Sequence, residues 1–199
     1  MPNWCENDLF VRTDWDEEDK RKIAKQKKEI KRFVKFAKTK KSVLDTEQFI
    51  PYPKKYRELD DRRKVLEAKH LAKCKRAKLD DMSDKDADAW RKKNPNIAWE
   101  TSDGFNSGGY EWCLKNWGTK WGICEAELLD DNGDELEYFF TSAWCPPDLV
   151  IKKMSKMFPT LIFTLTYFEG GCEFNGIYKC QKGEVIDDRC GKYFGSRGG

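Results

Sequence analysis

Apolar and polar side chains alternate in several short runs of the chain, whereas one longer run has the spacing of a helix. Residues 7–13 and 160–168 have the short alternating or apolar pattern that is typical of strands. Acidic and hydroxyl side chains at residues 13–19 are suited to cap a helix that follows them. This helix is predicted over residues 20–40, and its buried stripe is formed by Ile23, Ile30, Phe33, Val34 and Ala37.

The pattern weakens in the middle of the chain. Residues 43–50 are predicted to form a second strand, which ends at the prolines of residues 51–53. Residues 54–93 combine a weak apolar stripe with many lysines and arginines, and a capping motif at Ser83 and Asp86 precedes a short helix. Because this segment has too few apolar residues for a core of its own, we expect a helical insertion and not a separate domain.

The second half of the chain is rich in predicted strands. Alternating runs at residues 123–129 and 136–144 flank an Asn-Gly pair, which predicts a hairpin. A further strand at residues 160–168 is followed by a last hairpin, residues 174–180 and 184–186. Between the hairpins, Pro146 and Pro147 precede a helix whose inward-facing residues are Val150, Ile151, Met154, Met157 and Phe158.

The order of these elements predicts an α+β protein. We expect a ferredoxin-like split β-α-β core with extra β-hairpins and a helical insertion. In this division, residues 1–53 and 94–194 form the ferredoxin-like domain and residues 54–93 form the basic helical insertion. Residues 195–199 are expected to be a flexible tail.

Charge is distributed unevenly along the 199 residues, although the net charge is only +3. Residues 1–93 hold 28 basic and 19 acidic side chains, whereas residues 94–199 hold 10 basic and 16 acidic ones. A basic first half indicates an anionic partner, which is a nucleic acid or an acidic protein. The alternative is a dipolar protein whose two halves differ only in their solvated faces.

Candidate metal and cofactor sites are missing from the sequence. The 8 cysteines form no Cys-x-x-Cys pair, and His70, the single histidine, is expected to be a surface residue. We therefore predict no metal, no cofactor and no catalytic residue. The N-terminal residues lack the apolar run of a secretory signal, and no run approaches the roughly 20 apolar residues of a membrane span. Unpaired thiols then favour the cytoplasm, with no membrane contact.

A stretch of aromatic residues with one inserted lysine is the first candidate binding site. Trp117 and Trp121 are four positions apart, and Lys120 between them could stack on a Trp ring or contact a phosphate beside a stacked base. The alternative is that these tryptophans are core residues and that Lys120 extends outward. The candidate residues are Tyr110, Trp112, Asn116, Trp117, Lys120, Trp121 and Trp144.

The basic helix is the second candidate binding site. Residues 20–41 contain 12 lysines and arginines but one acid, Glu29. Its lysines could line a phosphate backbone or the groove of an acidic protein, or they could simply form a solvated helix face. The candidate residues are Lys25, Lys28, Lys31, Arg32 and Lys35.

Four motifs resemble one known family. They lie at residues 2–7, at residues 116–121 (Asn-Trp-Gly-Thr-Lys-Trp), at residues 141–147 and at residues 158–163. Together they resemble the YubB-like, Api-type phage and plasmid proteins that have a ferredoxin-like domain. The resemblance implies that fold and an origin in a phage or another mobile element, and it implies no catalytic residue. The basic block at residues 54–93 and the extra cysteines depart from the family pattern.

Three functions are compatible with these observations. The first is a non-enzymatic binding module of a phage or mobile element that acts on a host macromolecule, such as a host-defence or nucleic-acid-handling complex. Its partner would be a host protein or ribonucleoprotein. The second is a direct RNA or single-stranded DNA binding protein, because ferredoxin-like sheets can stack bases on aromatic residues. The third is an enzyme with an unrecognised site around Glu111, Lys120 and Glu169. The oligomeric state does not follow from the sequence.

Overall fold

The computed structural model describes residues 3–14 and 20–192, and these residues form two compact units. The smaller unit is the single segment Tyr52–Glu111, and the larger unit is formed by the chain on either side of it. The smaller unit includes the predicted insertion, residues 54–93, and is longer at both ends. The predicted capping residues 15–19 and the predicted tail, residues 195–199, lie outside the described residues.

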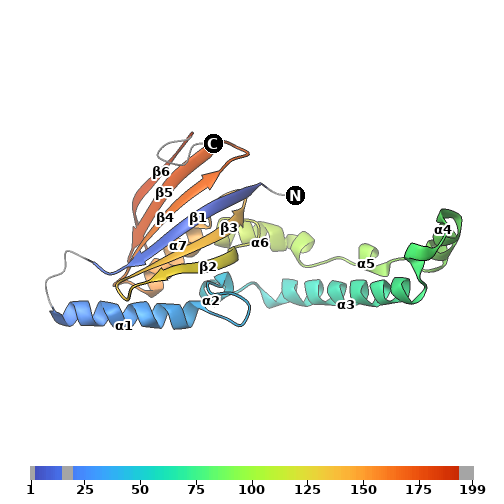
Figure 1. Ribbon diagram of the computed structural model, residues 1–199, viewed down its shortest axis with the longest axis horizontal. Coiled ribbons are helices and arrows are strands. Elements are labelled where there is room, and N and C mark those ends of the chain that lie inside the picture. The colour runs from blue at the N-terminus through green and yellow to red at the C-terminus, as the bar shows by residue number, and fades with distance from the viewer. Residues whose placement is uncertain (1–2, 15–19, 193–199) are drawn as a thin grey trace. The chain divides into compact units, whose positions relative to one another are not determined.

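The larger unit contains one antiparallel sheet of six strands (Figure 1). The strands are β1 (Trp4–Arg12), β2 (Cys124–Asp131), β3 (Glu135–Ala143), β4 (Ile162–Glu169), β5 (Phe174–Gln181) and β6 (Glu184–Gly191). They follow the spatial order β2-β3-β1-β4-β5-β6. The first four strands therefore have the order of a ferredoxin-like split β-α-β unit, and β5 and β6 extend the sheet beyond β4. The predicted fold class is confirmed.

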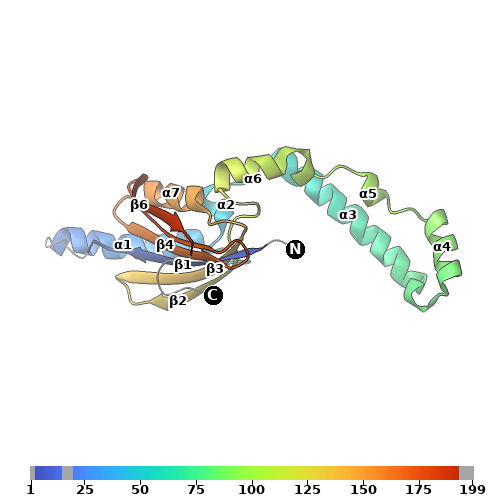
Figure 2. The same cartoon turned by 90° about the horizontal axis from the view of Figure 1, so that it is seen from above.

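Two helices pack on the same face of this sheet (Figures 1 and 2). They are α1 (Lys20–Ala37) and α7 (Asp148–Met157). The ring centroid of Phe33 in α1 lies 5.1 Å from that of Phe158, the residue directly after α7. It lies 5.6 Å from the ring centroid of Phe163 in β4. On β1, Leu9 and Val11 are fully buried toward these helices, as the alternation of a half-covered strand requires. This layer forms the core of the larger unit.

The buried stripe of α1 agrees largely with its prediction. Ile30, Phe33 and Ala37 are buried, whereas Ile23 and Val34 are only partly buried. On α7, Val150, Ile151 and Met154 are fully buried, as expected from their helical spacing.

The predicted strand at residues 43–50 is wrong. Residues Thr46–Phe49 form a short helix, α2, and the Asp45 carboxylate accepts a hydrogen bond of 2.9 Å from the backbone N–H of Glu47. This cap stabilises the helical turn against the extended conformation that the apolar alternation suggested. The second strand of the split β-α-β unit is instead β2, which follows the smaller unit in the chain.

The smaller unit is helical. It contains α3 (Lys54–Arg76), η1 (Leu79–Asp81), α4 (Asp84–Lys93), α5 (Ile97–Glu100) and the short π-helix η2 (Phe105–Gly109). Arg63 of α3 forms an ion pair with Asp103, and the Asp60 carboxylate accepts a hydrogen bond of 3.0 Å from the backbone N–H of Phe105. These contacts connect α3 to η2 and to the residues directly before it. Apart from such polar contacts, α3 is little anchored, because none of its own residues is buried. Helix α6 (Tyr110–Trp117) begins in this unit and ends in the larger one.

The capping motif before α4 is confirmed. The Ser83 hydroxyl group accepts a hydrogen bond of 3.3 Å from the backbone N–H of Asp86 and donates one of 2.6 Å to the Asp86 carboxylate. Among the helices of the described residues, none is long and apolar enough to cross a membrane.

Candidate functional site

The two tryptophans of the Asn-Trp-Gly-Thr-Lys-Trp motif have different environments. Trp117, the last residue of α6, is only 5% exposed, and its indole N–H donates a hydrogen bond of 2.9 Å to the carbonyl oxygen of Ile50. Trp121 is 40% exposed. Between them the Thr119 hydroxyl is buried and donates a hydrogen bond of 2.8 Å to the carbonyl oxygen of Ala143. Trp117 is thus a core residue, whereas Trp121 lies on a surface loop that is tied to the end of β3.

Three exposed tryptophans lie on chain segments that meet at this end of the sheet. The rings of Trp4 and Trp121 are 5.9 Å apart. Trp144 is 46% exposed, and its backbone N–H donates a hydrogen bond of 3.0 Å to the carbonyl oxygen of Asn3, the residue before Trp4. The ammonium group of Lys120 lies 4.6 Å from the ring centroid of Trp121. We call Trp4, Lys120, Trp121 and Trp144 the tryptophan surface.

The sequence placed three of these four residues in the candidate site and missed Trp4. Trp4 lies more than a hundred residues from the others in the chain, and only the pairing of β1 with β3 joins them, because Trp4 pairs with Ala143. The available signal was the motif at residues 2–7, which contains Trp4.

The remaining predicted aromatic-stretch residues lie elsewhere. Tyr110 belongs to the smaller unit, where its ring contacts Phe105 at 5.7 Å. Trp112 is partly buried and packs edge-to-face on Trp117 at 5.4 Å. The Asn116 side chain donates a hydrogen bond of 2.8 Å to the carbonyl oxygen of Trp112. Trp112 and Asn116 therefore have structural contacts within α6.

The five predicted residues of the basic helix are all exposed on α1. Their helical positions lie opposite the stripe of Ile30, Phe33 and Ala37. Arg32 has structural contacts, because it pairs with Glu29 at 3.2 Å and its guanidinium lies 4.5 Å from the ring centroid of Phe158. The other four form no ion pair with a residue that the structure describes. We call these four the basic face: Lys25, Lys28, Lys31 and Lys35.

The three residues of the enzyme hypothesis do not form a described site. Glu169 is 1% exposed, and its carboxylate accepts hydrogen bonds from the backbone N–H groups of Gly171 and Cys172, which stabilises the turn after β4. Lys120 stacks on Trp121, and Glu111 belongs to the smaller unit. His70 is partly buried, with its ring 6.2 Å from that of Trp90. Within the described ranges, no three His, Cys, Asp or Glu side chains form a group that could hold a metal ion.

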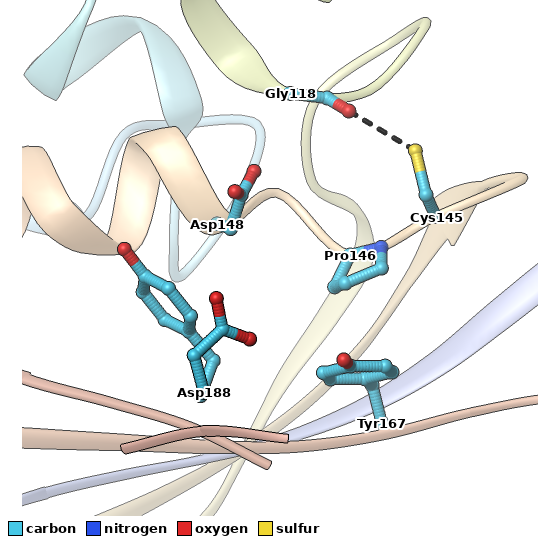
Figure 3. Close-up of a pocket in the computed structure, with 7 residues that line it drawn as sticks. Gly118, Cys145, Pro146, Asp148, Tyr167 and Asp188 are labelled. Atoms are coloured by element: carbon cyan, nitrogen blue, oxygen red, sulfur yellow. Dashed lines mark hydrogen bonds between the residues drawn. The ribbon is translucent and has the colours of Figure 1, made fainter. Parts of the chain in front are cut away.

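A cavity that the sequence did not indicate lies between the start of α7 and the sheet (Figure 3). Its volume is about 240 Å³. The thiol of Cys145 points toward the carbonyl oxygen of Gly118, at 3.0 Å, and burial raises the pKa of this thiol. Its two acids, Asp148 of α7 and Asp188 of β6, are forty residues apart in the chain, so no sequence motif marks the cavity. The residues that line it include Gly118, Cys145, Asp148, Tyr167, Tyr178 and Asp188.

The residues that line this cavity lie in a region that is similar to a known protein family. Residues 116–194 match the sequence model of a family described as the ferredoxin-like domain in Api92-like protein. The resemblance to YubB-like and Api-type proteins is confirmed. The uncharacterized protein YubB of Escherichia coli (strain K12) is 32% identical over 95 residues, which are 43% of this chain and 64% of YubB. The alignment thus spans less than two thirds of that relative's length.

A solved structure also aligns with this chain. The crystal structure of the protein Api92 from Yersinia pseudotuberculosis covers 99% of this chain and 100% of its own, with 12% identity and a TM-score of 0.45. The function of the Api92-like family is unknown.

The matched region, residues 116–194, includes the whole described lining of the cavity and three members of the tryptophan surface, Lys120, Trp121 and Trp144. Trp4 and the basic face lie outside residues 116–194, in the N-terminal part of the larger unit. The tryptophan surface is therefore assembled from the matched region and from strand β1, which lies between β3 and β4 in the sheet.

Proposed function

We propose that this protein is a non-enzymatic binding module that binds another protein through the tryptophan surface. The observation that supports it most is the exposure of three tryptophans, Trp4, Trp121 and Trp144, at 41%, 40% and 46%. The resemblance described in the sequence analysis implies an origin in a phage or another mobile element. With such an origin, we propose that the partner is a protein of the host cell, free or within a defence or nucleic-acid-handling complex.

Large aromatic side chains at the surface are the residues that dominate protein–protein binding. Tryptophan is enriched at the few interface positions that carry most of the binding free energy, since it buries a large area with few rotatable bonds. Here the Trp4 and Trp121 rings pack on each other, and Lys120 lies over the Trp121 ring. These contacts hold the rings in place before binding, so that little conformational entropy is lost when the partner docks.

The sheet itself favours a protein partner over a nucleic acid. A ferredoxin-like sheet that binds RNA stacks bases on aromatic residues of its uncovered face. In this sheet Phe139 is flanked on its two neighbouring strands by Asp8 and Glu127. Carboxylates at these positions repel the phosphates that would accompany a stacked base.

The basic face supports a second candidate function. Four exposed lysines on one side of α1 form a surface that an RNA or single-stranded DNA backbone could follow. Such binding would use α1 and not the sheet, and it would weaken steeply as salt rises.

Partner capture with matched variants tests the first proposal. The full chain is immobilised, and the partner captured from host lysate is identified, purified and titrated against each variant. Trp121→Ala and Trp144→Ala should each weaken binding at least about tenfold, as expected for central interface tryptophans. Trp99→Ala is the matched control, because Trp99 is 78% exposed but belongs to the smaller unit. Equal binding by all three variants would contradict the proposal.

A labelled single-stranded oligonucleotide tests the second function. If the basic face binds it, replacement of Lys28, Lys31 and Lys35 by glutamate should abolish binding at low salt, while Trp121→Ala should not. An oligonucleotide that binds the triple variant and the unchanged protein equally would exclude the basic face as its site.

A further inference from the structure

The cavity between α7 and the sheet is bordered by two carboxylates that come from different elements. Asp148 is the first residue of α7, and Asp188 belongs to β6. Figure 3 shows the Asp148 side chain extending from the helix side and the Asp188 side chain from the sheet side. None of the described residues that line the cavity is a lysine, an arginine or a histidine. The described lining thus has acidic groups on two of its sides and no basic group.

Two buried tyrosines contribute the floor of the cavity. Tyr167 and Tyr178 are 5% and 4% exposed, and Tyr178 pairs with Asp188 across β5 and β6. Burial raises the pKa of both phenol groups, which therefore remain protonated at neutral pH. The Tyr178 hydroxyl group forms no hydrogen bond with any residue that the structure describes. The Tyr178 side chain is buried, but its oxygen is not among the fully buried atoms without a partner. Because Tyr178 lines the cavity, a group bound there can reach the hydroxyl.

The groups around Asp148 favour the binding of a cation, because its carboxylate is partly buried and lies near a second acid. Its pKa is raised because burial disfavours the charged carboxylate and because Asp188 adds a second negative charge. The backbone N–H of Leu149 and the ammonium group of Lys152 act in the opposite direction. Lys152 forms no ion pair with Asp148, and it lies one helical turn further along α7. A positive charge placed between the two carboxylates would remove their repulsion.

We propose that this cavity binds an organic cation, an alkylammonium or guanidinium group, between Asp148 and Asp188. The lining suits an organic ion better than Ca²⁺, because Ca²⁺ takes six or more oxygen ligands, whereas this lining offers two carboxylates beside two tyrosine rings. The tyrosine rings can face the alkyl stem or the cation itself. A volume of about 240 Å³ accommodates one such group with part of its chain.

Gly118 shapes the entrance next to Asp148. Its φ angle is +80°, and a Cβ atom at this position would collide with the Asp148 carboxylate. A side chain at residue 118 would therefore displace Asp148 from the cavity, which explains why the turn after α6 needs glycine there.

Calorimetric titration of the full chain tests the proposal. The probes are n-butylammonium and n-butylguanidinium chloride, and n-butanol is the neutral probe of similar shape. Both cations should bind and n-butanol should not. Asp188→Asn should weaken cation binding about tenfold or more, the loss expected for a hydrogen bond to a charged group. Asp187→Asn is the matched control, because Asp187 is the adjacent residue of β6 and pairs with Arg189 instead.

Further variants separate binding from folding. Asp148→Asn should weaken cation binding as Asp188→Asn does, and Tyr178→Phe should weaken it by a smaller factor, since the ring remains. Thermal unfolding of each variant shows whether it is folded; Asp188 is exposed, so Asp188→Asn remains informative even if Asp148→Asn unfolds. Absence of cation binding, equal binding of n-butanol, or full binding by Asp188→Asn would overturn the proposal.

A blocked peptide with a single central arginine, and its lysine counterpart, distinguish the two sources of such a cation. Binding of the free cations alone assigns the cavity to a small-molecule amine or guanidine. Binding of the peptides assigns it to a side chain of a protein partner. Capture of a partner through the tryptophan surface should be unchanged in Asp188→Asn, so that failure of one proposal leaves the other standing.

Discussion

Helices α1 and α3 are both long and rich in lysine and arginine, but only α1 buries a stripe of side chains. Four of its 18 residues are buried, Gln26, Ile30, Phe33 and Ala37. Helix α3 has 23 residues and buries none. Its apolar residues Val65 and Leu71 are 52% and 55% exposed. The two helices have similar compositions, and the spacing of the apolar residues decides which of them belongs to a core.

The two basic helices are also stabilised by different interactions, α3 by ion pairs along its surface and α1 by packing. Side chains of α3 form ion pairs one turn apart, Arg63 with Glu67 at 3.1 Å and Lys54 with Glu58 at 3.5 Å. Such pairs contribute a few tenths of a kcal/mol each, about 0.3–0.5 in helices. Helix α1 is held by its packing, so the lysines of the basic face are not needed for folding. They are free to serve a partner, which is why we regard them as a functional candidate.

The largest change in stability is expected when one buried aromatic ring of α1 is removed. Phe33→Ala should lower the free energy of unfolding by about 3–5 kcal/mol, because Phe33 packs on Phe49, Phe158 and Phe163 in the core. Chemical denaturation measures the loss. Leu71→Ala in α3 is the control and should change stability by no more than about 0.5 kcal/mol. Similar losses in both variants would mean that α3 is buried in solution.

The capping of α4 gives an intermediate effect within the smaller unit. Ser83→Ala should destabilise this helix by about 1 kcal/mol, since the first backbone N–H groups lose their acceptor. Hydrogen exchange should show the loss as faster exchange in residues 84–93. Ser102→Ala, an exposed serine of the same unit, should leave the exchange unchanged. Unchanged exchange in Ser83→Ala would show that packing, and not the cap, holds α4.

Charge reversal on α1 should have a small effect on stability. Lys28→Glu and Lys31→Glu should each change the free energy of unfolding by no more than about 0.5 kcal/mol, because both side chains are exposed. Lys35→Glu should cost somewhat more, up to about 1 kcal/mol, since it places a negative charge in the last turn of the helix. Thermal unfolding measures these shifts. A loss comparable to that of Phe33→Ala would show that the basic face is structural.

Removal of most of the smaller unit should have the smallest effect on the larger unit. With residues 54–107 replaced by a short glycine–serine linker, the rest of the chain should still unfold in one cooperative transition, because its core residues are all retained. Circular dichroism and tryptophan fluorescence should report the same midpoint. Loss of the transition would show that the smaller unit is required for folding.

Most of the fold could be predicted because its signals are local. The turn at Asn132 and Gly133 forms as predicted: the Asn132 side chain accepts hydrogen bonds from the backbone N–H groups of Asp134 and Glu135, and Gly133 has a φ angle of +85°. Residues 43–50 were misassigned because an apolar alternation over a short segment suits a strand and a capped helical turn equally. The hydrogen bond that the Asp45 carboxylate accepts and the packing of Phe49 on Phe33 both favour the helical turn.

The candidate sites were harder to predict because they depend on distant contacts. Trp117 and Trp121 are equivalent in the sequence, but α6 ends between them, with Gly118 at a φ angle of +80°. One ring therefore enters the core and the other does not. The cavity was missed because the last strand was predicted to end at residue 186, whereas β6 continues to Gly191 and carries Asp188.

The edge strand β2 limits how this protein can meet other chains. Its register with β3 shifts twice, and Glu125 adopts a left-handed conformation with a φ angle of 50°. Irregular spacing and the acids Glu127, Asp130 and Asp131 make this edge a poor template for a further strand. A partner cannot readily be recruited here by β-augmentation, in which backbone groups alone provide the affinity. The same irregularity disfavours edge-to-edge pairing of β2 with the sheet of another copy.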